Sequence, residues 1–161
     1  MIRSALLLAA FTFAAPLLAG CASILGDQTA EVDFNVEPRA DGTYFYWNDI
    51  TVGGGGVDAA RLLAVTLDTL SPEGTPDLTY MENLTGVGVA PSGERTPFCS
   101  VSSFPRGEEA VVADVLFHDN IVPFFDSSDT LRIEWSGAVN PSVIFPDGGF
   151  EVRARLKVSP Q

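Results

Sequence analysis

The segment Phe150-Glu151-Val152-Arg153-Ala154-Arg155-Leu156-Lys157-Val158 alternates apolar and polar side chains without a break. In an extended strand successive side chains point to opposite faces, so this segment has one apolar face and one polar face. Such a strand packs one face on a core and leaves the other in water. The polar face carries Arg153, Arg155 and Lys157, which predicts cross-strand pairing with acidic neighbours such as Glu31 or Glu134.

The same two-residue period recurs along the chain. It predicts further strands over residues 30–36, 43–47, 62–70, 85–90, 98–104, 111–117 and 131–137. Asp41-Gly42, between the first two of these, favours a β-hairpin. Seven or eight short strands separated by Gly, Pro and Asp turns predict an all-β fold. The expected architecture is an antiparallel β-sandwich, immunoglobulin-like or related, because two sheets packed face to face cover their apolar sides.

Three short segments interrupt the strand pattern. Thr75-Pro76-Asp77 has the N-cap residue, the N1 proline and the early acid of a helix start, which predicts a short helix through Leu84. Ile121–Phe125 predicts a loop or a single helical turn. Gly53–Gly56 lacks the downstream Gly-Lys-Ser/Thr of a phosphate-binding loop, which indicates a linker.

The first 21 residues differ in character from the rest. After Met1-Ile2-Arg3, residues 4–18 are predominantly apolar, which is typical of a signal peptide and shorter than the roughly 20 residues that a helix needs to span a bilayer. This run ends in Leu18-Ala19-Gly20-Cys21, which resembles the lipobox of bacterial lipoprotein precursors at every position. The resemblance covers only these residues, and no family is recognised for the remainder.

The resemblance implies diacylglycerol transfer to the Cys21 thiol, cleavage between Gly20 and Cys21, and acylation of the new N-terminus. It divides the chain into a signal peptide (1–20), a lipidated cysteine with its tether (21–29) and a β-sandwich domain (30–161). Ala22 is not the Asp that resembles an inner-membrane retention signal, so in a Gram-negative envelope the outer membrane is the expected site. The alternative is an ordinary secretory signal, with Cys21 an incidental thiol.

The charge of the chain limits its partners. The net charge is -12, and removing residues 1–20 takes away Arg3, which leaves 21 acidic against 8 basic side chains, or -13. Such a surface repels phosphate backbones and anionic head groups, so nucleic acid is not an expected partner. The expected partners are the membrane, through acyl chains on Cys21, and an envelope protein or glycan.

Few residues suggest chemistry. With Cys21 acylated, Cys99 has no intramolecular partner and is expected to be buried as a small hydrophobe, the alternatives being a reactive thiol or an intermolecular disulfide. His118 is the only histidine and is expected at a strand end on the surface, without the Gly-x-Ser-x-Gly elbow of a hydrolase. Neither a metal site nor a cofactor is expected. Calcium at the acidic turns Asp126–Asp129 and Asp147–Gly149 is a weaker alternative.

Aromatic side chains are the strongest candidates for contact with a ligand or partner. Consecutive rings at residues 44–47 place rings on both faces of one strand, and a further pair lies in a loop. Exposed rings can stack on sugars or anchor a protein, whereas buried rings fill the core. The candidate contact residues are Tyr44, Tyr46, Trp47, Phe124 and Phe125.

Together these features predict a lipid-anchored module of the cell envelope that binds, scaffolds or interacts at a surface and is not an enzyme. One alternative is a small envelope hydrolase that uses loop carboxylates, which would require clustered acids with raised pKa values. A second alternative is an accessory subunit of an envelope complex.

Overall fold

The computed structural model describes residues 26–51, 57–70 and 78–161. The predicted signal peptide, its cleavage site, Cys21 and the Gly53–Gly56 linker lie outside these residues. Within them, no helix has the length and apolar character needed to cross a membrane.

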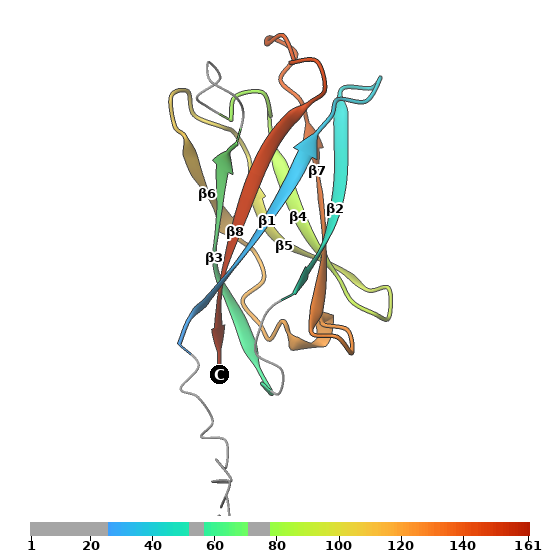
Figure 1. Ribbon diagram of the computed structural model, residues 1–161, viewed down its shortest axis with the longest axis vertical. Helices are drawn as coiled ribbons and strands as arrows, with labels where there is room; N and C mark the ends of the chain where they lie inside the picture. The colour runs from blue at the N-terminus through green and yellow to red at the C-terminus, as the bar shows by residue number, and fades with distance from the viewer. Residues whose placement is uncertain (1–25, 52–56, 71–77) are drawn as a thin grey trace, which may run out of the picture.

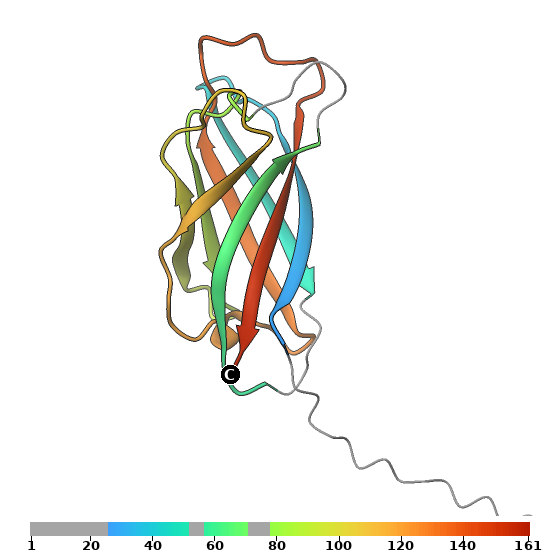
Figure 2. The ribbon, with the colours of Figure 1, turned by 90° about the vertical axis from the view of Figure 1, so that its left-hand side faces the viewer.

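The described residues form eight antiparallel strands in one sheet, of order β1-β8-β3-β6-β5-β4-β7-β2, which curls into a nearly closed, barrel-like body (Figures 1 and 2). The all-β prediction and its strand number are therefore confirmed. The strands are β1 Gln28–Val36, β2 Thr43–Thr51, β3 Ala60–Thr69, β4 Leu84–Val89, β5 Arg95–Val101, β6 Ala110–Val115, β7 Thr130–Ala138 and β8 Phe150–Pro160. The first of these begins two residues before the expected start of the β domain at Ala30.

The sheet is continuous because β6 changes partner along its length. Its residues 110–113 pair with β3, and its residues 114 and 115 pair with β5. A strand that bends from one layer to another in this way makes a corner. The hydrogen-bonded ladder therefore runs through this corner, and the two layers are not separate sheets.

The predicted hairpin between β1 and β2 is wrong. The turn forms, with Gly42 at φ 76° and the Thr43 amide donating to Asp41 Oδ1 at 3.0 Å, but the two strands lie at opposite ends of the sheet order. β1 pairs with β8 along its whole length, and β2 pairs with β7. The turn thus connects the two ends of the curled sheet, which face each other across a seam.

Complementary charge accompanies the pairing of β1 with β8. Arg153 donates two hydrogen bonds to Asp33, and Arg155 donates one to Glu31. Lys157 pairs with Asp27 at 2.8 Å. The predicted pairing of these bases with Glu31 is confirmed, whereas the predicted pairing with Glu134 is wrong, because Glu134 pairs with Arg95 on β5.

The helix predicted through Leu84 does not form within the described residues. Residues 75–77 lie outside them, residues 78–83 form turns and an isolated bridge from Met81 to Val139, and β4 begins at Leu84. Leu78, Met81 and Leu84 are all buried, so the three-residue spacing reflects a turn that inserts apolar side chains into the core. Of the two alternatives predicted for Ile121–Phe125, a loop or a single helical turn, the structure has the turn, as the 3-10 helix η1, Val122–Phe124.

The core fills the interior of the curled sheet. Trp135 on β7 is fully buried, and its ring stacks on Phe34 of β1 with 5.1 Å between centroids. Glycines make room for the large rings. A Cβ at Gly137 would lie 2.2 Å from the carbonyl oxygen of Asn83 and 2.6 Å from the hydroxyl of Tyr44.

Gly137→Ala is therefore expected to destabilise the fold by about 1–3 kcal/mol, because the added methyl meets a backbone carbonyl that cannot move away cheaply. Urea unfolding followed by circular dichroism measures the change. Gly26→Ala is the matched control, because nothing lies within 4 Å of a Cβ at that position. Equal stability of the two variants would contradict this account of the core.

Candidate functional site

The structure narrows the set of predicted contact residues. Tyr44 is buried, and its hydroxyl donates a 2.7 Å hydrogen bond to the carbonyl of Asn83. Phe124 is buried edge-on against Phe98, with 4.9 Å between ring centroids. Phe125 is half-buried against the core. These three rings stabilise the interior and leave Tyr46 and Trp47 as the accessible candidates.

Three consecutive rings of β2 are exposed. The exposed fractions are 37% for Phe45, 37% for Tyr46 and 51% for Trp47. Phe45 and Trp47 alternate with the buried Tyr44 and so lie on the outer face of the sheet. Tyr46 lies on the inner face with Tyr44, but at the seam between β1 and β2. Its ring centroid is 6.3 Å from that of Phe34 on β1, and it stays partly open to solvent.

An ion pair stands beside these rings. The register of β2 with β7 places Asp49 opposite Arg132, and the guanidinium donates from Nε at 2.8 Å and from Nη2 at 3.0 Å to the two carboxylate oxygens. The same guanidinium lies 4.6 Å from the centroid of the Trp47 ring. A cation over an indole face is attracted by the ring quadrupole, so Arg132 is held from two sides.

The ion pair shifts the pKa of both Asp49 and Arg132. Hydrogen bonds from Arg132 hold the pKa of the Asp49 carboxyl below its ordinary value of 3.8. The same contact raises the pKa of Arg132. Both groups are therefore charged at neutral pH, and the pair presents a fixed dipole beside the rings.

We call Phe45, Trp47, Asp49 and Arg132 the aromatic face. Arg39, from the β1–β2 connection, extends it, because its guanidinium carbon lies 5.3 Å from the centroid of the Phe45 ring. The predicted contact residues did not include Phe45, Asp49 or either arginine, although the run of rings at residues 44–47 contains Phe45. The alternation along β2 already placed Phe45 and Asp49 with Trp47, but only the strand pairing brings Arg132 to them.

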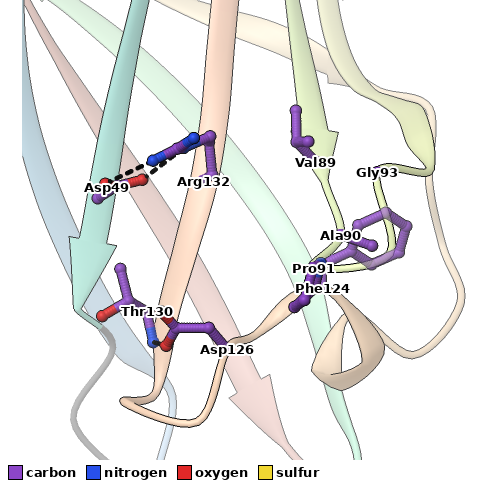
Figure 3. Close-up of a pocket in the computed structure, with 9 residues that line it drawn as sticks. All are labelled: Asp49, Val89, Ala90, Pro91, Gly93, Phe124, Asp126, Thr130 and Arg132. Atoms are coloured by element: carbon purple, nitrogen blue, oxygen red, sulfur yellow. Dashed lines mark hydrogen bonds and ion pairs between the residues drawn. The ribbon is translucent and has the colours of Figure 1, made fainter.

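Two hollows meet at the aromatic face. One, of about 520 Å³, is lined by residues 45–49 of β2. The other, of about 340 Å³, lies between β2, the start of β7, η1 and the β4–β5 turn (Figure 3). Both are lined by Asp49, so they adjoin at this residue. The second hollow is lined by Asp49, Val89, Ala90, Pro91, Gly93, Phe124, Asp126, Thr130 and Arg132.

The other candidates lie apart from one another. His118 is exposed after β6. Asp126 Oδ1 accepts the amides of Ser128 at 2.8 Å and Thr130 at 3.0 Å, which is a side-chain-capped turn. Asp147 is exposed in the turn before β8. Across the described ranges, no three His, Cys, Asp or Glu side chains gather as metal ligands would.

Cys99 is buried, as expected. Its side chain is 1% exposed, and burial raises the pKa of the thiol to about 12. The thiolate is the reactive form of cysteine, so this environment disfavours reaction at neutral pH.

Comparison with known proteins finds no relative of this chain. Protein-family models, curated proteins and solved structures all give no match to this chain. The basis for assigning a function is therefore the chemistry of the aromatic face.

The pH dependence of stability tests the ion pair. A carboxyl with a depressed pKa stabilises the fold above its unfolded pKa, here 3.8, and loses that contribution as the pH falls through the folded value. Asp49→Asn should therefore cost about 0.2–1 kcal/mol at pH 7, the range for exposed pairs. The cost should vanish at pH values below the folded pKa of Asp49.

Urea unfolding of the wild type and of Asp49→Asn between pH 2 and pH 7, at about one point per pH unit, measures the difference in their free energies of unfolding. Glu37→Gln, in the exposed connection after β1, serves as the control for loss of one negative charge. A difference between wild type and Asp49→Asn that is constant over the whole pH range would contradict the pairing.

Proposed function

We propose that this protein is a lipid-anchored cell-envelope protein whose β domain binds a partner through the aromatic face. The lipobox resemblance of Leu18-Ala19-Gly20-Cys21 supports the anchor. Two or three acyl chains give stable membrane attachment, where a single chain is marginal. Seven residues, Cys21–Asp27, precede β1, so the domain stays within roughly 25 Å of the bilayer surface.

The exposure of Trp47 is the single observation that carries the binding half of the proposal. Large rings at a protein surface beside a hollow mark interaction sites more often than isolated apolar side chains do. Here the ring is flanked by Phe45 and fixed by Arg132, so it is already ordered before a ligand arrives. Preorganised groups lose little entropy on binding.

We also propose that the domain is related to β-sandwiches of the immunoglobulin-like kind. β1, β8 and β3 form one layer and β5, β4, β7 and β2 the other, with the corner at β6 between them. In this interpretation the aromatic face lies on the outer side of the second layer.

The carboxyl groups of residues 26–51, 57–70 and 78–161 do not favour a hydrolase that uses loop carboxylates. A general acid needs a raised pKa. Among the described carboxyl groups with a shifted pKa, hydrogen bonds from neighbouring side chains lower it in every case. These groups are Asp27, Asp33, Asp41 and Asp49.

Substitution of the lipidated residue tests the anchor. Cys21→Ser should abolish incorporation of labelled palmitate and release the protein from the membrane fraction of a bacterial host, because the thioether cannot form. Cys99→Ser is the control, because a buried thiol is not a lipidation site, and this variant should remain labelled. Labelled Cys21→Ser would refute lipid attachment at Cys21.

Site-specific photo-crosslinking tests the binding surface in intact cells. A benzophenone side chain at position 47 should give covalent adducts, whereas the same group at Val112, which is 69% exposed on β6, should not. Adducts at neither position, or equally at both, would refute binding through the aromatic face.

A further inference from the structure

The polar atoms beside the exposed rings narrow the class of ligand. Each Asp49 oxygen accepts one hydrogen bond from Arg132 and, having two lone pairs, can accept another from a ligand hydroxyl. The guanidinium has five N–H donors, of which Asp49 engages two. Ring faces with adjacent fixed donors and acceptors match a saccharide, which presents C–H groups on the face of its ring and hydroxyls around its edge.

Charge favours an uncharged ligand. Beside the rings Asp49 pairs with Arg132 and Glu134 pairs with Arg95, while Arg39 at the Phe45 ring and Asp126 at the second hollow add one charge of each sign. This surface is therefore close to neutral on a chain of net charge -12. A cationic partner would find stronger attraction on the acidic remainder of the surface, and a polyanion would be repelled by it.

Shape favours an extended ligand. The hollows of about 520 Å³ and about 340 Å³ share Asp49, and both are open to solvent. The first is lined by residues 45–49 of β2, and the second extends from the Asp49–Arg132 pair to the β4–β5 turn (Figure 3). A ligand that fills both passes over the Asp49–Arg132 pair and is longer than a single sugar.

We propose that the aromatic face binds an uncharged glycan chain, with one sugar ring stacked on the face of Trp47 that Arg132 does not cover and the next held by Asp49 and Arg132. This inference rests on the proposed function, whose binding surface it uses. It names the ligand of that surface.

The two tryptophans of the chain provide the measurement. Trp47 is 51% exposed and Trp135 is 0% exposed, so acrylamide should quench the fluorescence of Trp47 selectively. The probes are dimers and hexamers of β-1,4-linked N-acetylglucosamine and of β-1,4-linked glucose. They are added to the acylated full chain in a detergent without a sugar head group.

At least one hexamer should protect Trp47 from acrylamide, and it should bind about tenfold more tightly than its dimer, because only the longer chain reaches both hollows. Trp47→Ala should weaken binding about tenfold or more, measured by calorimetry, because it removes both the stacking and the apolar area of the ring. Asp49→Asn should also weaken it. Val112→Ala, on an exposed site of β6, should bind as wild type does, and circular dichroism verifies that every variant is folded.

The outcomes separate this inference from the proposed function. No binding of any probe, or binding that leaves Trp47 quenchable, overturns the glycan inference. If adducts at position 47 are then peptides, the binding surface stands with a protein as its partner. If position 47 gives no adducts either, both proposals fail.

Discussion

The buried indole of Trp135 holds together the two ends of the sheet. Its ring stacks on Phe34 of β1, nearly parallel at 3° between planes, and its Nε1 donates a 3.2 Å hydrogen bond to Asn48 Oδ1 on β2. Asn48 in turn donates from Nδ2 to the carbonyl of Asp33 on β1 at 3.1 Å. The seam between β1 and β2 is thus bridged by side chains where neighbouring strands elsewhere share backbone hydrogen bonds.

The aromatic face depends on this closure. Asn48 lies between Trp47 and Asp49, so anchoring its side chain inward fixes the two neighbouring side chains outward. Phe45 and Trp47 keep their exposure because they lie on the outer face of the sheet. Tyr46 stays partly open to solvent at the seam edge of β2, to which no described strand is hydrogen-bonded. The interaction that closes the body also orients the residues that we propose contact a ligand.

The sequence predicted strand positions better than strand partners. Alternation over residues 150–158 reflects local periodicity, which survives in any sheet, and the segment is indeed β8. The Asp41-Gly42 turn also formed. The pairing of β1 with β8 was not predicted, although the expected contact between the bases of β8 and Glu31 is present. This pairing brings Arg153 and Arg155 to acids more than a hundred positions away, and local periodicity does not show which strands are neighbours.

For the candidate site, the sequence likewise indicated the aromatic residues but not their burial or their partners. Trp47 and Tyr46 were identifiable as candidate rings, but their burial depended on how neighbouring strands cover them. Tyr44, two residues from Tyr46 on the same face, is buried because the Gly137 region accepts its ring. Arg132 became part of the site only through the register of β7 against β2, a relation across 83 positions of sequence.

The full-length ladder between β1 and β8 has a mechanical consequence. The ladder runs from the pair Gln28 and Val158 to the pair Val36 and Phe150. The N-terminal end of β1 is the end nearest to Cys21 in the sequence. Tension between the proposed membrane anchor and the proposed ligand on β2 would act along the axis of β1. A force in that direction loads all nine paired residues of the ladder in shear, and does not unzip them one after another.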